Sequence, residues 1–206
     1  MKKLLAVVAL VAAMFVAGNV QAQTSIHAGY APETIKTGNS ATNLNGFFAG
    51  VDYNMGLAKG LGLSLGGQLR LNTESGSSSI GGIAGAKHTT TQLLLDIPVL
   101  LNYGFAINRD AKISVFAGPT INFGLLAQTK YEGNVLGFGG SSTVDWYNQN
   151  GLNFKRFNLS GTAGIAFTFR QFRIFGGYNY GFLDLDNANN TTTNTAAPFF
   201  GIGYAL

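Results

Sequence analysis

Five charged residues stand at alternate positions within segments that are otherwise apolar or rich in glycine, serine and asparagine. On their own parity most neighbours are small or polar, whereas large apolar side chains dominate the other parity. Charges on a buried face need opposite partners, because an unpaired buried charge is costly. The pattern therefore predicts a structural charge network, and its members are Asp52, Arg70, Asp96, Arg156 and Arg173.

One pair within this network can be predicted from position. Counted from the nearest short turns, Arg70 and Asp96 lie at similar heights on neighbouring segments. We therefore expect these two side chains to interact inside the fold. Structural ion pairs are a commoner cause of such groupings than catalysis, so we interpret the pair as part of a polar filling.

A second grouping has the residue types of a nucleophilic site. His88 lies near Ser77, Ser78 and Ser79, and a histidine beside a serine can activate the hydroxyl. However, no G-x-S-x-G or comparable motif is present, and the segment is rich in serine throughout. We predict no catalytic residues and no enzyme activity. A lipid-modifying enzyme is the alternative to be tested.

A third grouping is rich in oxygen atoms that could hold calcium. Its spacing does not match the EF-hand pattern, and Asn and Asp favour solvated turns in any case. We predict a turn here, and no metal or cofactor site. The residues are Asp184, Asp186, Asn187, Asn189 and Asn190.

The elements that carry these residues are long alternating strands. From Gly60 to Asn72 every leucine falls on one parity, and small or polar residues occupy the other. This is the period-2 pattern of a strand with one apolar face. An ordinary strand has about 5–6 residues, whereas about 9–11 tilted residues cross a bilayer. The stretch is therefore long enough to span a membrane.

Eight such segments can be marked, at about 24–32, 44–57, 60–72, 89–105, 111–126, 153–169, 172–184 and 197–206. Pro98 and Pro119 fall inside two of them, where each could mark a bulge. Long polar connections are predicted at 33–43, 74–88, 127–152 and 185–196, and tight turns at 58–60, 106–110 and 170–171. Long loops at one end and short turns at the other are typical of outer-membrane barrels.

Composition decides which face points outward. Charged residues make up only 11% of the chain and 29 residues are glycine, so the polar parity would make a poor water-facing surface but fits a narrow lumen. The predicted fold is all-β: an eight-stranded antiparallel up-and-down transmembrane β-barrel. The net charge is +4, and removal of Lys2 and Lys3 with a leader would leave +4 − 2 = +2. This is too small to indicate a nucleic-acid or acidic partner.

The first 22 residues have the three parts of a signal peptide. Lys2 and Lys3 precede an apolar run, and Val20-Gln21-Ala22 supplies a cleavage site. We expect a signal peptide at 1–22 and the barrel domain at 23–206. No later stretch is apolar enough for a membrane helix, so export and closure into a barrel predict an outer-membrane location.

Three stretches resemble the outer-membrane β-barrel (porin-like) families common in Bacteroidetes-type bacteria. They are Asp96 to Tyr103, Phe116 to Pro119, and Gly201 to Leu206. The last also resembles the terminal signal read by the barrel-assembly machinery, with Gly201, Tyr204 and Leu206 at the matching spacing. The family more often ends in Phe. The resemblance implies an architecture and no catalytic residues.

The predicted function follows from a filled lumen and long loops. We expect a monomeric integral outer-membrane protein with a structural or surface-interaction role, carried by four long extracellular loops. A small-solute porin is the first alternative. The expected partners are outer-membrane lipid and lipopolysaccharide, with the barrel-assembly machinery during biogenesis.

Overall fold

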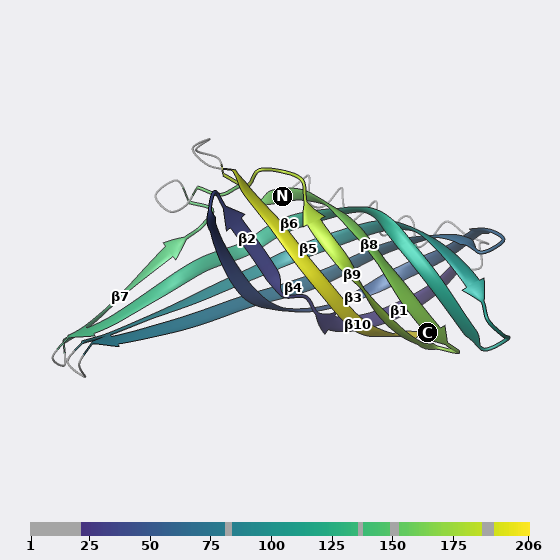
Figure 1. The fold of residues 1–206 in the computed structure, drawn as a ribbon, viewed down its shortest axis with the longest axis horizontal. Coiled ribbons are helices and arrows are strands. Elements are labelled where there is room, and N and C mark those ends of the chain that lie inside the picture. The colour runs from purple at the N-terminus through teal and green to yellow at the C-terminus, as the bar shows by residue number, and fades with distance from the viewer. Residues whose placement is uncertain (1–21, 81–83, 136–137, 149–152, 187–191) are drawn as a thin grey trace.

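The computed structural model describes residues 22–80, 84–135, 138–148, 153–186 and 192–206. All the regular elements in this part of the chain are strands (Figure 1). They are β1 (Ala22–Tyr30), β2 (Glu33–Thr37), β3 (Ser40–Ala58), β4 (Leu61–Ile80), β5 (Ala84–Ala106), β6 (Ala111–Val135), β7 (Phe138–Asp145), β8 (Phe157–Phe169), β9 (Phe172–Gly181) and β10 (Thr193–Ala205). The predicted signal peptide, apart from Ala22, lies outside the described residues.

The strands close into an antiparallel barrel. Neighbours in sequence pair from β3 through β6, and β6 then pairs with β8. β8 pairs with β9, and β9 pairs with β10. β1 closes the ring because it pairs with β10 on one side and with β3 on the other. Closure leaves no edge in this ring, which is what a strand protein requires within a bilayer.

β1 and β2 together form one wall of the barrel. Tyr30 pairs with Phe47, and Glu33 pairs with Leu44, so the register against β3 is unchanged across Pro32. The pairing with β10 is continuous in the same way. The described walls therefore number eight, and β7 is an additional strand attached to β6 outside the ring. This agrees with the predicted fold class.

The two faces of the wall are distributed as predicted. Outward positions are apolar and exposed, with Phe172 66% and Ile202 67% accessible. Most inward positions are polar and buried, with Asn72 and Ser160 at 0%. Phe48 and Phe116 also point inward and are each 5% exposed. A soluble barrel has the opposite arrangement, so the outer surface is suited to hydrocarbon.

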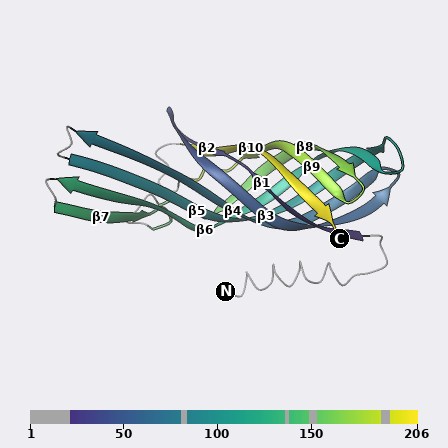
Figure 2. The same ribbon diagram turned by 90° about the horizontal axis from the view of Figure 1, so that it is seen from below.

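Three strands continue far beyond the ring and form a separate sheet with β7. Beyond Thr73 and Phe123, β4 and β6 lose their pairing to β3 and β8, while the ladders between β4, β5, β6 and β7 continue. We call residues 74–80, 84–90, 129–135 and 138–145 the projecting sheet. Figure 2 shows these four strands side by side, extending away from the barrel.

The projecting sheet corrects the predicted loops. Most of 74–88 and of 127–145 is strand, and within 33–43 β2 and β3 are joined by a tight turn. β2 has buried side chains at Glu33 and Ile35. Residues 74–88 and 127–145 are instead mostly polar on both faces, so their sequence predicts loops. A strand that is solvated on both sides has no apolar alternation to reveal it. The last connection is displaced, because β9 ends at Gly181, before the predicted strand end at 184, and β10 begins at Thr193.

The opposite end of the barrel has only short turns, as predicted, between β3 and β4, β5 and β6, and β8 and β9. The prolines are not bulges. Register is kept past Pro98 and Pro119, and the shifts occur at Gly56/Ala58 and beside Leu93. The described residues include no helix long and apolar enough to cross a membrane.

Candidate functional site

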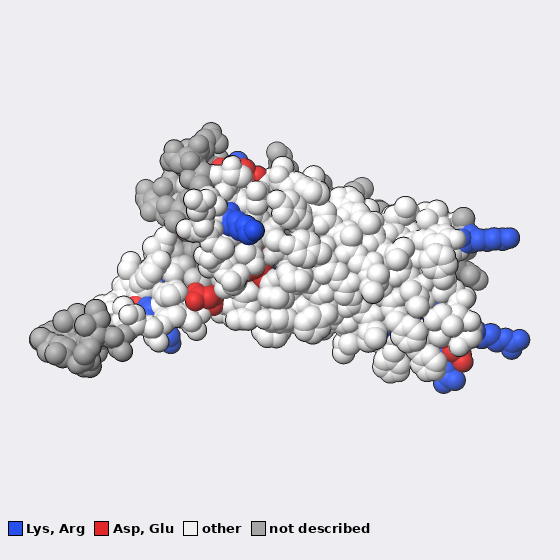
Figure 3. All heavy atoms as spheres, viewed as in Figure 1, with Lys and Arg blue, Asp and Glu red and all other residues white. Residues whose placement is uncertain are grey.

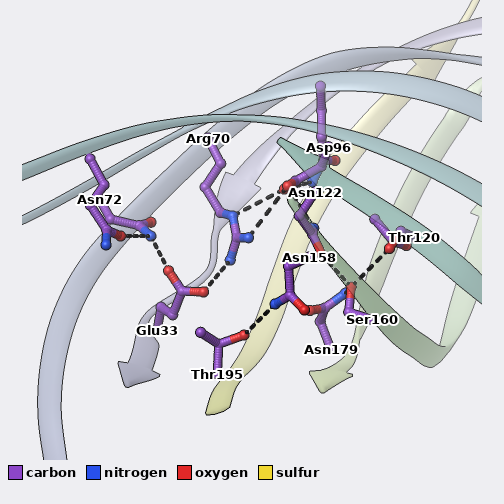
Figure 4. A network of polar contacts seen from close by, with 12 residues as sticks. Glu33, Arg70, Asn72, Asp96, Thr120, Asn122, Asn158, Ser160, Asn179 and Thr195 are labelled. Carbon is purple, nitrogen blue, oxygen red and sulfur yellow. Dashed lines mark hydrogen bonds and ion pairs between the residues drawn. The ribbon is translucent and has the colours of Figure 1, made fainter. Parts of the chain in front are cut away.

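The centre of the lumen is held by Arg70, which reaches two carboxylates. Its Nε lies 3.0 Å from Asp96 Oδ2, and its Nη1 lies 3.4 Å from Glu33 Oε1. All three side chains are almost fully buried (Figure 4). Arg70 and Asp96 are the pair expected to interact. Glu33 lies in the predicted connection 33–43, but its parity continues that of His27 and Gly29 and indicates the lumen face.

Amide and hydroxyl side chains extend this cluster to the other walls. Asn122 donates to Asp96 Oδ1 at 2.7 Å, and Ser160 donates to Asn122 Oδ1 at 2.7 Å. Asn179 in turn donates to Ser160 Oγ at 2.9 Å. On the other side Asn72 donates to Glu33 and to Gln92. A connected polar layer therefore crosses the barrel from β2 to β9, as Figure 4 shows, and such layers are rigid when their members are satisfied.

A third acid, Asp52, is partly buried on the short-turn side of this layer. Asp52 Oδ2 is 2.9 Å from Nδ1 of His27, and His27 Nε2 is 3.1 Å from Gln68 Oε1. Gln68 also donates to Asp96 at 3.2 Å. Asp52 is thus connected to the Arg70 cluster through neutral and imidazole groups rather than by a direct ion pair with an arginine.

The polar layer leaves little open space in the lumen. A cavity of about 70 Å³ lies against Arg70 on the side of His27 and Asp52. A second cavity of about 30 Å³ lies on the side of Glu33 and Gln92. A cavity must offer at least one probe-sized volume to hold a water, so both can hold a few waters, with Arg70 between them.

An apolar cap covers the long-strand end of the lumen. Trp146 packs with Ile35, Leu44 and Ala127 in a buried cluster. Its ring meets that of Phe154 edge-on, with the two ring centroids 5.7 Å apart. The indole also donates to Thr129 Oγ1 at 2.9 Å. Ile35, Ala127 and Trp146 fall in segments predicted as loops, so the sequence pattern did not reveal this cluster. Leu44 and Phe154 lie at the ends of predicted strands. The cap places a packed core where an open pore would have its entrance.

Arg156 lies at this cap and not in the central network. β8 begins at Phe157, one residue later than Arg156. The guanidinium lies 4.4 Å from the ring centroid of Tyr147 and donates to the carbonyls of Gly124 and Leu125. Burial raises the pKa of the Tyr147 phenol to about 12, against a smaller lowering by the Arg156 charge.

Arg173 also stands apart from the Arg70 cluster. Its guanidinium lies 5.5 Å from the ring centroid of Phe116 and 5.3 Å from that of Phe175. No described carboxylate forms an ion pair with it. Of the five charges predicted to form one network, the structure brings Arg70 and Asp96 into direct contact, links Asp52 to them indirectly, and separates Arg156 and Arg173.

A family comparison identifies this architecture. The sequence model of the family described as "Outer membrane protein beta-barrel domain" matches residues 12–187. The protein is an outer-membrane β-barrel of this family. Its narrower resemblance to families of Bacteroidetes-type bacteria stays a prediction. No curated protein sequence matches the chain.

Solved outer-membrane proteins are among the structures that the chain matches, all at low sequence identity. Ail of Yersinia pestis, in complex with the heparin analogue sucrose octasulfate, is 17% identical with a TM-score of 0.47, covering 90% of this chain and 99% of its own. Neisserial surface protein A is 10% identical with a TM-score of 0.46, and the match covers 88% of this chain and 96% of its own. OprG of Pseudomonas aeruginosa is 13% identical with a TM-score of 0.36, and the match covers 92% of this chain and 98% of its own.

In an outer-membrane barrel the short turns face the periplasm and the longer connections face outward. The projecting sheet of this barrel is therefore extracellular. β4, β5 and β6 have 20, 23 and 25 residues, and about 9–11 are enough to cross the bilayer. Roughly half of each strand lies beyond the hydrocarbon.

The terminal residues of the barrel are part of its closure. Gly201 packs so closely that an added Cβ would lie 2.7 Å from the carbonyl oxygen of Ala28. Tyr204 donates to Gln171 Oε1 at 3.0 Å, and the amide of Leu206 donates to the carbonyl of Thr24 at 2.8 Å. Recognition of these residues by an assembly machinery stays a prediction.

The remaining candidate groups lie in the extracellular part. Asp184 accepts the backbone amides of Asp186 and Thr193, which lower its pKa and organise the turn. Asn187, Asn189 and Asn190 of the predicted turn lie outside the described residues. No group of three or more possible metal ligands occurs among the residues that the structure describes.

Proposed function

We propose that this outer-membrane barrel is a non-conducting surface-interaction protein whose binding element is the projecting sheet. The observation that carries the proposal is the combination of a closed lumen with strands that continue far outside the membrane. A pore would need neither the long strands nor the buried polar layer. A purely structural barrel would not need a sheet extending into the medium.

The closed lumen argues against the porin alternative. Arg70, Glu33 and Asp96 occupy the cross-section, and the Trp146 cluster covers the outer entrance. Eight strands give an interior just wide enough for side chains. The two small cavities on either side of the polar layer would connect into a channel only if the Arg70 side chain moved aside.

The projecting sheet has the surface of a recognition element. Lys87, Lys130 and Glu132 lie on one face and His88 and Tyr131 on the other, among serines and threonines. His88 and Tyr131 are about half exposed, and their rings lie 6.4 Å apart. Hydroxyls, charges and one aromatic surface on a rigid scaffold can bind polar ligands in the medium.

The absence of an enzyme activity is also part of the proposal. His88 Nε2 lies 3.0 Å from Glu74 Oε2, and no hydroxyl of a described serine is hydrogen-bonded to this imidazole. A serine nucleophile needs the base within hydrogen-bond reach. Lipid A profiles that are unchanged by His88→Ala would agree with this assignment, and a loss of lipid modification would contradict it.

Partners and oligomeric state belong to the same proposal. Outward aromatic residues are suited to outer-membrane lipid and lipopolysaccharide. They include Tyr30, whose ring contacts those of Phe47 and Phe200. The ring is complete within one chain, so we propose a monomer, folded with the help of the barrel-assembly machinery.

The test combines conductance with surface binding. The refolded protein is inserted into planar bilayers, where we expect no solute-sized conductance. In parallel, whole cells displaying the protein are exposed to arrays of glycans and matrix proteins. The comparison variant joins residues 74 and 90, and residues 129 and 144, by two-residue turns. Binding that disappears in this variant while heat-modifiable gel mobility persists supports the proposal. Steady conductance with no array binding contradicts it.

A further inference from the structure

The two arginines inside the barrel differ in their counter-charges. Arg70 contacts both Asp96 and Glu33. Arg173 is stacked on aromatic rings, and within the described residues it has neither an ion pair nor a hydrogen bond. The nearby carboxylate of Asp52 is bonded to His27 instead. A half-buried guanidinium without a direct counter-ion retains its capacity to bind an anion.

Two further donors lie in the same row as Arg173. Lys112 pairs in register with Thr168, and Thr168 pairs with Arg173. The three residues belong to adjacent strands and share the lumen-facing parity. Directly opposed side chains have Cβ atoms about 4.5–5.5 Å apart. The Cβ atoms of Lys112, Thr168 and Arg173 therefore form a row across three strands, and the Lys112 side chain extends from this row over Gly104 of β5.

These side chains line an open vestibule at the periplasmic mouth. The vestibule has a volume of about 160 Å³ and includes Lys112, Thr168, Arg173, Ser114, Asn102 and Gln171 in its wall. None of the side chains described in this wall is a carboxylate. The space is large enough for a phosphate-sized anion with some of its water.

The opposite wall of the vestibule is already satisfied. Asn102 donates to Ser64 Oγ at 2.8 Å, Ser64 donates to Asn54, and Asn54 donates to Ser25 Oγ at 3.1 Å. By contrast, the hydroxyls of Thr168 and Ser114 have no hydrogen-bond partner in the described part of the chain. The available donors are therefore concentrated on the cationic wall.

The surroundings of the mouth have the same sign. Lys59, Arg109 and Arg170 occupy the short turns, and Asp110 is the acidic residue described there, 3.6 Å from Arg170. Figure 3 shows Lys and Arg side chains gathered at this end of the molecule. Cations around an opening raise the local concentration of anions.

We propose that the periplasmic mouth is a binding site for a phosphate-type oxyanion, independent of the extracellular function. Arg173 supplies the planar fork, Lys112 a point charge and Thr168 a hydroxyl donor. The oxyanion is either free phosphate or the phosphate of an anionic lipid headgroup in the adjacent leaflet. The two sources share this chemistry and are separated by the experiment.

The first arm measures calorimetric binding of inorganic phosphate to the refolded, detergent-solubilised protein at low ionic strength. Arg173→Gln removes the fork and should weaken binding about tenfold, the usual loss for one charge-assisted hydrogen bond. Arg173→Lys keeps the charge without the planar fork, so its phosphate affinity should lie between those of wild type and Arg173→Gln. Lys59→Gln is the matched control, with the same change of charge at a turn outside the vestibule.

A charge-neutral variant separates the site from general electrostatics. An added Cβ at Gly104 would lie 1.8 Å from Cε of Lys112, so Gly104→Ala must displace the lysine side chain. The net charge is unchanged. We expect Gly104→Ala to weaken phosphate binding while the heat-modifiable mobility of the folded barrel is preserved.

The second arm uses nanodiscs of phosphatidylcholine with or without phosphatidylglycerol, and compares the thermal stability of wild type and Arg173→Gln. Saturable phosphate binding that depends on Arg173 identifies the free ion. Stabilisation by phosphatidylglycerol alone, lost in Arg173→Gln, identifies the headgroup. Equal phosphate affinity in Arg173→Gln and Lys59→Gln overturns the proposal. So does the absence of an Arg173-dependent effect in both arms.

Discussion

Arg70 and Asp96 face each other diagonally across two adjacent strands inside the barrel, with Nε 3.0 Å from Oδ2 and both side chains almost fully buried. Glu33 approaches the same guanidinium from the wall formed by β1 and β2. The contact thus joins β4 to β5, and through Glu33 it also joins β4 to β2. It holds together walls that are distant in sequence.

Arg70→Leu should therefore destabilise the barrel strongly. The substitution leaves Asp96 and Glu33 buried without their cation, and breaking a buried pair in this way costs about 3–5 kcal/mol. The measurement is urea unfolding in detergent micelles, followed by the fluorescence of Trp146, the only tryptophan. Arg156→Leu is the matched control, because this exposed arginine has no carboxylate partner among the described residues. Equal midpoints for the two variants would show that the pair is not structural.

The cap predicts the accessibility of the same tryptophan. Trp146 is 7% exposed and packs against Phe154. Phe154→Ala should open the cap and increase quenching of Trp146 by acrylamide, while the barrel keeps its heat-modifiable mobility. Ile26→Ala, on the outward face of β1, should leave quenching unchanged. A tryptophan that is quenched freely in the wild type would mean that the lumen is not capped.

How much of this could be read from the sequence depends on the faces of each strand. The pairing of Arg70 with Asp96 was predictable because both lie on strands with one apolar face. The short turns nearby fix the position of each residue along the barrel axis. Glu33 was missed because Pro32 interrupts the alternation. Trp146 was missed because the cap follows a strand that is solvated on both sides, where no hydrophobic period exists to reveal its position.

The alkaline side of the stability profile should depend on Tyr147. The phenol has a pKa of about 12 in the fold and about 10 in the unfolded chain. Because the folded state holds the proton more tightly, this contribution is complete below pH about 10 and is lost as the pH rises toward 12. Tyr147→Phe should therefore lose less folding stability than wild type over this pH range. The direct check is absorbance at the phenolate band, where the difference between wild type and Tyr147→Phe should be a single group titrating near 12. A difference titrating near 10 would contradict the buried position.

Two glycines on neighbouring strands test which face of the wall is close-packed. A Cβ added at Gly50 would lie 2.4 Å from the carbonyl oxygen of Gly67 and 2.5 Å from Cβ of Gln68, whereas one at Gly67 would meet nothing within 4 Å. Gly50 has the lumen-facing parity and Gly67 points outward. Gly50→Val should therefore cost at least about 1–3 kcal/mol, because backbone atoms cannot move aside as a flexible side chain would. Gly67→Val should be neutral or stabilising, since it adds an apolar, β-branched side chain on the lipid-facing surface. The unfolding midpoints of the two variants in the same lipid decide the matter. If Gly67→Val is the more damaging, the inward and outward faces of this part of the barrel are exchanged.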